Sequence, residues 1–183
     1  MLRYIAWTLH YGCYYQREKE APLTGFSDSD LASDLDTRKS TTGVFFFLGS
    51  SLITWQSQKQ RVVALSSCEA EYIAATTAAC QGIWLARLLA ELKGERVRSI
   101  TLKMDSESAI QLSKNPVFHD HCKHIDVRYH LIRECVEENR LKLQSVRTAE
   151  ELADILTKAL GPQQFCELRS KIGVIDVQTV NKA

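Results

Sequence analysis

Four acidic side chains stand where an acid has no evident local task. Asp28 falls inside a strand-like segment, where an acid has poor propensity and makes no turn. Asp105 follows the strand-like "SITLKM", at the kind of edge where mixed sheets bind ligands. Glu71 and Asp154 lie in helical patterns and are not needed for capping. Each alone is more often a solvated surface acid. If the fold brings them together, they repel one another unless divalent cations such as Mg²⁺ lie between them.

The segment "LSSCEAEYIAA", residues 65–75, gives its two glutamates different roles. Ser66 and Glu69 have the S-x-x-E spacing of a capping box, so Glu69 has a structural task. A helix rotates by about 100° per residue, so the two carboxylates diverge by about 200°. Glu69 then shares the wetter face with Thr76, whereas Glu71 lies on the stripe expected to pack on a sheet. There it needs a metal ion or hydrogen bonds, unless it reaches water at the helix edge. The helix alone favours neither alternative.

Strand and helix patterns follow one another in an order that predicts a mixed sheet. The segments "LTGFSDSD", "VFFFLG" and "LITWQSQ" indicate an antiparallel meander of about three strands. A long helix over about 67–92 follows, and then the strand "SITLKM", helices and the strand "LKLQSV". We expect "AEELADILTKAL" to be a helix after a second capping box, Thr148-x-x-Glu151, and "PQQFCELRSKIG" to be another. The sheet is therefore expected to be flanked by helices.

Composition limits the classes of protein that this chain can represent. Its 183 residues are 45% hydrophobic and 25% charged, and the formal net charge is +1. No overall basic field attracts nucleic acid, so local groups must grip any such partner. Six cysteines include no C-x-x-C pair, and we expect a reducing compartment. No signal peptide is evident, and no run approaches the roughly 20 apolar residues of a membrane span. We expect a soluble protein with no membrane partner.

The stretch "HDHCKH" and the later His130 suggest a zinc site. Its candidate ligands are His119, His121, Cys122 and His124. They are too crowded for the usual paired spacing, and no second pair is evident. We interpret the stretch as a polar turn that leads into a helix.

Several long stretches resemble, in order, the ribonuclease H domain of copia-type retrotransposon polyproteins. They are "GFSDSDLASDLDTRKSTTGVFFFLGSSLITWQSQKQRVVALSSCEAEYIAA", "KHIDVRYHLIRE" and "ELADILTKAL". The resemblance covers residues 23–173. Residues 1–22 resemble the end of the connection that follows reverse transcriptase, and 174–183 are expected to be a flexible tail. The resemblance implies an α/β fold: a ribonuclease H-like mixed five-stranded sheet, with three antiparallel strands and then two parallel ones, flanked by helices.

The four acids match the catalytic residues of that family. Asp28 in "FSDSD" matches its first aspartate, Glu71 in "AEYIA" its glutamate, Asp105 in "MDSES" the next aspartate and Asp154 in "LADIL" the last. The resemblance implies two Mg²⁺ ions about 4 Å apart, with Mn²⁺ as a substitute. Asp28 would bridge both ions, with Glu71 and Asp105 on one ion and Asp154 on the other.

The implied activity is endonucleolytic hydrolysis of the RNA strand of RNA–DNA hybrids during retrotransposon reverse transcription. The implied partners are the hybrid and the reverse transcriptase domain of the same polyprotein. The protein would then be intracellular, in a cytoplasmic virus-like particle or in the nucleus, and not secreted. The alternative is a catalytically silent retroelement remnant that acts as a structural or nucleic-acid-binding module.

Six other residues are candidates for holding the hybrid. Ser66 and Ser67 open the long helix, whose free N–H groups attract anions, so they could hold a phosphate of the DNA strand. The basic candidates are Arg38, Lys39, Lys59 and Arg61. Each of these is more often a solvated surface charge. Such modest charge predicts weak binding by the isolated domain.

Overall fold

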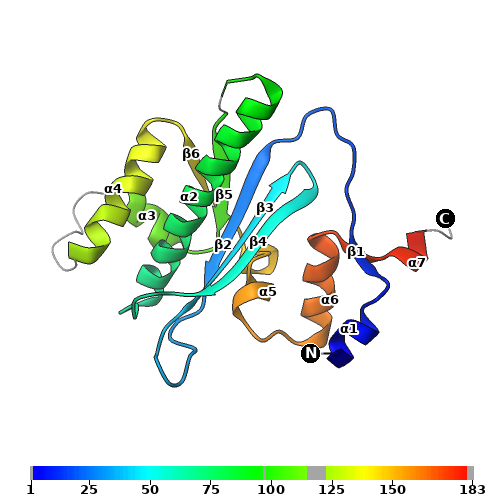
Figure 1. Ribbon diagram of the computed structural model, residues 1–183. Helices are drawn as coiled ribbons and strands as arrows, with labels where there is room; N and C mark the ends of the chain where they lie inside the picture. The colour runs from blue at the N-terminus through cyan, green and yellow to red at the C-terminus, as the bar shows by residue number, and fades with distance from the viewer. Residues whose placement is uncertain (1, 97, 115–122, 181–183) are drawn as a thin grey trace.

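The computed structural model describes residues 2–96, 98–114 and 123–180, and it has a mixed sheet flanked by helices (Figure 1). The five strands of the sheet are β2 (Leu23–Ser29), β3 (Thr41–Leu48), β4 (Ser51–Lys59), β5 (Ile100–Met104) and β6 (Leu141–Ser145). Their order is β4-β3-β2-β5-β6. The first three strands along the chain pair antiparallel, whereas β5 pairs parallel with both β2 and β6. The predicted fold class is confirmed.

Helices cover both faces of this sheet (Figure 1). Those on one face are α2 (Ser67–Lys93), α3 (Glu107–Lys114) and α4 (Lys123–Glu137), and those on the other are α5 (Asp154–Thr157) and α6 (Pro162–Lys171). Side chains of the run "VFFFLG" pack on both faces of the sheet, because alternate residues of a strand point in opposite directions. Val44 and Phe46 pack under α2, and Phe45 and Phe47 pack toward α5 and α6. Both cores therefore include side chains of β3.

A glycine lets α2 lie directly on the sheet. A Cβ atom built on Gly82 would lie 2.4 Å from the Ile100 side chain and 2.9 Å from the Phe46 ring. Any larger residue would push the helix away, because packed interiors leave no such space. The close approach fixes the height of α2 above the strands, and with it the position of every side chain at its N-terminal end.

The first half of α2 is buried on almost all sides. The serine half of the capping prediction is confirmed, since the Ser66 hydroxyl accepts the Glu69 N–H at 3.1 Å. The Glu69 carboxylate accepts the N–H of Leu65, one residue before the cap, at 2.9 Å. The predicted wetter face is wrong in this half of the helix, since Glu69 is only 7% exposed and Thr76 only 8%, although Arg87 and Glu91, further along the same face, are exposed. The sheet packs on one side of the helix, and residues 62–64 cover another through Ala64, so helical periodicity could not identify a wet face there.

Among the described helices, α2 is the one with the length and hydropathy of a membrane span. Its apolar character has another explanation, because Tyr72, Ala75 and Ala78 pack into the core above the sheet. Gly94, in the left-handed conformation at φ 64°, ends the helix close to the predicted boundary.

The two ends of the chain pair with each other. The first elements are α1 (Leu2–Trp7) and β1 (Tyr11–Cys13), and the last are β7 (Val174–Asp176) and α7 (Val177–Val180). β1 and β7 form an antiparallel pair, and the Arg169 guanidinium lies 4.2 Å from the centre of the Tyr11 ring. Residues 174–180, expected to be a flexible tail, form β7 and α7, and β7 pairs with a strand in the first 22 residues. The predicted domain boundaries stay a prediction. The link between residues 1–22 and reverse transcriptase stays a prediction.

The predicted helix "AEELADILTKAL" is wrong in its extent. Residues 148–150 form a single 3-10 turn, and α5 has only four residues, starting at Asp154. No capping box forms at Thr148, because the residue that caps this turn is Arg147. Leu152 and Ala153 are buried against the phenylalanines of the sheet, so tertiary packing overrides the helical propensity of the segment.

Candidate active site

Three of the four predicted acids converge at one edge of the sheet. Asp28 lies near the end of β2, Asp105 directly follows β5, and Glu71 lies in the second turn of α2. Each offers a carboxylate oxygen, and the three oxygens all lie within 4.8 Å of one another. Because β2 and β5 run parallel, their carboxyl ends meet at the same edge, beside the start of α2 (Figure 1).

Glu71 has one oxygen in use and one without a partner. Its Oε1 accepts the Ser29 N–H at 3.3 Å, and its Oε2 is buried with no hydrogen-bond donor among the described residues. Burial raises the pKa of Glu71 to about 9, and the negative charges of Asp28 and Asp105 add to the rise. A cation beside these carboxylates would reverse that effect.

These three side chains fit a divalent metal ion. They offer only oxygen ligands, which hard cations such as Mg²⁺ and Mn²⁺ prefer. The unpaired Oε2 of Glu71 is a buried acceptor without a donor, which is costly unless a cation satisfies it. Asp105 is partly exposed, so the cluster is reached from solvent.

The fourth acid comes from the other face of the sheet. A glycine brings α5 against β3, since a Cβ atom on Gly43 would lie 2.7 Å from the Thr157 side chain and 2.9 Å from the Ala153 carbonyl oxygen. Gly43 is also the residue that pairs with Asp28 across β2 and β3. Asp154, the first residue of α5, is thereby placed beside Asp28, and it is 2% exposed.

A lysine lies between Asp28 and Asp154. The Lys158 Nζ donates to Asp154 Oδ1 at 2.6 Å and to Asp28 Oδ1 at 3.1 Å. The Thr157 hydroxyl donates to the other oxygen of Asp28. Both oxygens of Asp28 therefore have a donor from the same short segment of chain.

The electrostatics of this side differ from those around Glu71. Burial alone would lower the pKa of Lys158, but the hydrogen bond to Asp154 and the charge of Asp28 outweigh it and hold the pKa above its ordinary value. Burial raises the pKa of Asp154, and the hydrogen bond from Lys158 opposes the rise. Lys158 thus stays charged and compensates the two aspartates.

A fifth acid, Glu151, is completely buried next to the site. Its Oε1 accepts the Ala153 N–H at 3.0 Å, and its Oε2 has no donor among the described residues. Burial raises the pKa of Glu151 to about 9, with a smaller contribution from the charge of Asp28. The predicted capping role is wrong, and the residue is a neutral acid that supports the backbone just before Asp154.

Sequence reasoning missed Thr157, Lys158 and the burial of Glu151. One signal was available, because Lys158 follows Asp154 by four residues, a spacing that favours ion pairs on a helix. The contact of either residue with Asp28 spans about 130 positions, and no local pattern indicates it.

The predicted nucleic-acid residues lie at the same end of the sheet as the acids. Ser66 and Ser67 are exposed at the start of α2, although the Ser66 hydroxyl is occupied in capping. Arg38 and Lys39 belong to the loop between β2 and β3. The remaining two basic candidates are Lys59, at the end of β4, and Arg61, just beyond it.

Lys59 differs from the other basic candidates because it has an ion-pair partner. Its ammonium pairs with Asp34, and this hydrogen bond, with those from Thr37, holds the pKa of Asp34 far below its ordinary value. Arg61 is exposed and, with Lys59 and Thr42, lines a shallow hollow of about 280 Å³. Their binding to nucleic acid stays a prediction.

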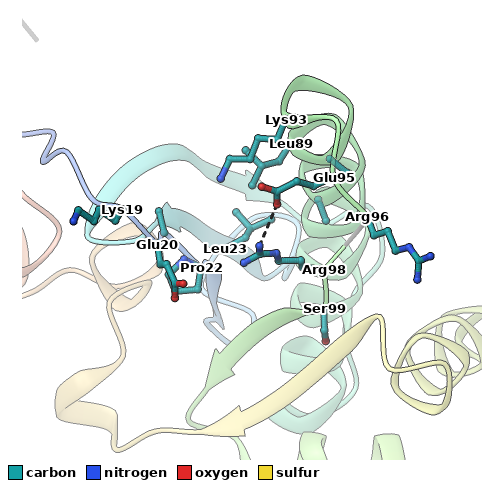
Figure 2. A pocket seen from close by; sticks show the side chains of 13 residues that line it. Lys19, Glu20, Pro22, Leu23, Leu89, Lys93, Glu95, Arg96, Arg98 and Ser99 are labelled. Carbon is teal, nitrogen blue, oxygen red and sulfur yellow. Dashed lines mark ion pairs between the residues drawn. The ribbon is translucent and has the colours of Figure 1, made fainter.

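Another hollow lies away from the acids. It measures about 350 Å³ and is formed by the end of α2 and the start of β2, opposite the edge that holds Asp28. Figure 2 shows Glu95 and Arg98 paired across it, at 3.2 Å, with Arg96 pointing away. Charges of both signs line this hollow, and they do not converge on one point.

The candidate zinc stretch cannot be placed in the same way. Residues 119–122 lie outside the described part of the chain, and so does the side chain of His124. Five of the cysteines, at 13, 68, 80, 135 and 166, are described, and all five are free thiols.

Comparison with known sequences reveals relatives among transposon polyproteins. The chain is 44% identical over 174 residues to the retrovirus-related Pol polyprotein from transposon TNT 1-94 of Nicotiana tabacum, and 39% identical over 177 residues to that from transposon RE1 of Arabidopsis thaliana. These matches cover 95% and 97% of this chain, but only 13% and 12% of the polyproteins. The chain thus spans about one eighth of their length. No protein-family model matches the sequence.

Solved structures agree on the fold. The N-terminal RNase H domain of Rv2228c from Mycobacterium tuberculosis superposes with a TM-score of 0.54 at 13% identity, covering 82% of this chain and 97% of that one. LC11-RNase H1 in complex with an RNA/DNA hybrid superposes with a TM-score of 0.52 at 13% identity, covering 74% and 93%. At such identities the likeness concerns the fold alone.

Proposed function

The chain belongs with the Pol polyproteins of copia-type retrotransposons and has the ribonuclease H fold, and from this premise we propose that it hydrolyses the RNA strand of RNA–DNA hybrids. The observation that carries the proposal is the convergence of Asp28, Glu71 and Asp105, whose carboxylate oxygens lie within 4.8 Å of one another. A structural neighbour with this fold was solved with an RNA/DNA hybrid, which supports the choice of substrate.

The residues of the site divide into two sets of metal ligands. Glu71 and Asp105 would hold one divalent ion, Asp154 would hold a second, and Asp28 would contact both. We propose Mg²⁺, with Mn²⁺ as a substitute, because all the ligands are carboxylate oxygens. When bound, such ions activate a water and stabilise the departing oxygen of a phosphodiester.

The chain itself positions these ligands and controls the local charge. The Ser29 N–H fixes one oxygen of Glu71, and the Thr157 hydroxyl fixes one oxygen of Asp28. A cluster of carboxylates repels a phosphodiester, so substrate can approach only after the acids are compensated by cations. Asp105, at the open side of the cluster, is the ligand nearest to solvent.

Recognition of the hybrid requires two further kinds of contact. The 2′-hydroxyl distinguishes RNA from DNA, and Glu71 with the neighbouring backbone is the proposed partner for that group. Backbone phosphates would be held by Arg38, Lys39 and Arg61 and by the N-terminus of α2 at Ser66 and Ser67. The reverse transcriptase domain of a full polyprotein is the proposed partner that supplies the remaining affinity, in an intracellular particle or in the nucleus.

A hybrid-cleavage assay on the purified chain tests the proposal. We expect cutting of the RNA strand with Mg²⁺ and none with EDTA, and Glu71→Gln should abolish cutting. Glu69→Gln is the matched control two residues away: it should keep activity and lower the unfolding free energy by about 1 kcal/mol, since Glu69 contributes to the cap. Equal loss of activity in both folded variants would refute the assignment of Glu71.

The competing function is a catalytically silent module of the same fold. One observation favours it: Asp28 and Asp154 are already compensated by Lys158, so this part of the site is satisfied without a metal ion. Under this alternative the wild-type chain would bind a hybrid without cutting it at any Mg²⁺ or Mn²⁺ concentration.

A further inference from the structure

Lys158 lies where the two sets of proposed ligands meet. Its ammonium is 3.1 Å from Asp28, the acid shared by both sets, and 2.6 Å from Asp154. The side chains of these aspartates are 0% and 3% exposed, so each would be a buried negative charge without the lysine. Removing one partner of a buried ion pair is strongly destabilising. The ammonium therefore compensates the Asp154 side of the metal-free protein.

The Lys158 ammonium occupies the position that a metal ion held by Asp154 and Asp28 would take. A cation bound to those oxygens and the Lys158 ammonium would compete for the same lone pairs and would repel each other at short distance. Among the described residues, no basic side chain occupies the corresponding place between Glu71 and Asp105. The Asp154 side therefore contains the Lys158 ammonium, whereas the Glu71 side contains no basic group among the described residues.

The Lys158 side chain can also move away from the two aspartates. The side chain is 38% exposed, and the residue follows α5 directly, in extended backbone at φ −123° and ψ 146°. A lysine has a long flexible stem and a strongly hydrated head, so it can turn toward solvent or toward a substrate phosphate. A buried, rigid cation could not make that exchange.

We infer that Lys158 is a built-in competitor for the second metal ion: its ammonium stabilises Asp28 and Asp154 in the metal-free protein and is displaced when a metal ion occupies the Asp154 side. The inference rests on the proposed function, since it concerns the same carboxylates. It makes Lys158 a positioning residue that sets how tightly the second ion binds. It also gives the two sides different affinities, with the Glu71 side filled first.

The test is Mn²⁺ binding to the purified full chain, measured by titration calorimetry without nucleic acid. Lys158→Met removes the charge and keeps the length of the side chain. We expect it to bind the second Mn²⁺ about tenfold more tightly than wild type, because the competing charge is gone. Lys158→Arg keeps the charge and should behave as wild type. Lys142→Met, at an exposed position of the edge strand β6, is the matched control for net charge and should also behave as wild type.

Thermal unfolding supplies a second readout. In EDTA, Lys158→Met should melt at a lower temperature than wild type, and saturating Mn²⁺ should raise its melting temperature more than it raises that of wild type. A purely structural role would lower both melting temperatures without changing Mn²⁺ affinity. Should Lys158→Met not fold in EDTA, Lys158→Gln, which keeps a hydrogen-bond donor, allows the same measurement.

The outcomes separate this inference from the proposed function. If wild type binds Mn²⁺ and Lys158→Met binds it with the same affinity and stoichiometry, the inference is refuted and the proposed function stands. If neither protein binds Mn²⁺, both ideas are overturned together. A second ion that appears only in Lys158→Met supports the inference in its strongest form.

Discussion

The two sides of the carboxylate site reach charge balance in different ways. On the side of Glu71 and Asp105, acids converge without a basic partner among the described residues, and one buried oxygen of Glu71 lacks a donor. On the side of Asp154, a lysine and a threonine from one short segment satisfy Asp28 and Asp154. Without a metal ion, the raised pKa of Glu71 relieves the repulsion on the first side through a bound proton, whereas the second side is compensated by the Lys158 ammonium.

The difference follows from the elements that build each side. Glu71 and Asp105 come from α2 and the end of β5, which are fixed by the core above the sheet. Asp154 comes from the four-residue helix α5, which is held to β3 by the close approach at Gly43. The Asp154 side therefore depends on how closely a four-residue helix packs on the sheet, where Leu156 also accepts a hydrogen bond from the Ser57 hydroxyl of β4.

Asp28→Asn should have the largest effect on activity, because Asp28 belongs to both sides of the site. We expect hybrid cleavage to fall by about 10³-fold or more, since a metal ion supplies several kcal/mol of transition-state stabilisation and each 1.4 kcal/mol is worth about tenfold. The measurement is the rate under single-turnover conditions at saturating Mg²⁺. A variant that unfolds normally in EDTA yet keeps wild-type activity would exclude Asp28 as a ligand.

Gly43→Ala should damage the Asp154 side alone. The new methyl group would lie 2.9 Å from the Ala153 carbonyl oxygen, so α5 must move and carry Asp154 and Lys158 with it. We expect a loss of about 1–3 kcal/mol in unfolding free energy and a fall in cleavage rate of up to about 100-fold. Binding of the first Mn²⁺ should be unchanged.

The matched control for that variant is Gly161→Ala. A Cβ atom on Gly161 meets nothing within 4 Å, and its backbone is extended at φ −63°. Cleavage should match wild type, and the unfolding free energy should fall by less than about 1 kcal/mol, because Gly161 is the N-cap of α6. If Gly161→Ala and Gly43→Ala behave alike in urea unfolding, the close contact at Gly43 is not what holds α5.

The pH dependence of the unfolding free energy tests the raised pKa values of the buried glutamates. The pKa of Glu71 and that of Glu151 are each raised from 4.5 to about 9 in the folded protein. Between these values the native state holds protons that the unfolded chain has lost, so stability falls as pH rises. We expect the unfolding free energy in EDTA to be highest near pH 5 and to decrease toward pH 9, as measured by urea unfolding.

Glutamine variants show how much each glutamate contributes to the pH dependence of the unfolding free energy. Glu71→Gln and Glu151→Gln should each reduce the pH dependence, because an amide does not titrate. Their activities should differ, since Glu71 belongs to the cluster of converging oxygens and Glu151 does not. A pH slope that neither variant changes would contradict the assigned protonation of both glutamates.

The smallest effect is expected outside the acids. Arg61 is exposed at the end of the sheet that carries the site, so Arg61→Gln should weaken hybrid binding a few-fold. The loss of one phosphate contact should also reduce the slope of log affinity against log salt concentration by about one. Lys142→Gln, near the start of β6 at the opposite end of the sheet, is the control. Metal binding should be the same in both variants, and equal hybrid affinity would remove Arg61 from the interface.

Local pattern was sufficient for much of the fold. The S-x-x-E spacing at Ser66 located the start of α2, and Gly94 its end. Alternation and turn residues located β2, β3 and β4, because strand registers depend on neighbours close in sequence. The positions of Asp28, Glu71 and Asp105 were predicted from acids that had no local use and from the family resemblance, and their convergence is observed.

Propensity failed where long-range packing decides. The segment before Asp154 contains good helix formers, yet burial of Leu152 and Ala153 against the sheet leaves α5 with four residues. Glu69 was expected to be wet, yet it is buried, because a helix wheel does not include the loops that cover a helix. The β1–β7 pair joins segments more than 160 residues apart, beyond any local signal.

By itself, therefore, the sequence determined which side chains are acidic, which segments become strands of the five-stranded sheet and where the long helix begins. Only the tertiary structure decided that Lys158 and Thr157 contact Asp28, and that Glu151 lies buried beside them with a raised pKa. The physical reason is that a side chain's charge balance depends on neighbours in space. At this site those neighbours come from opposite faces of the sheet.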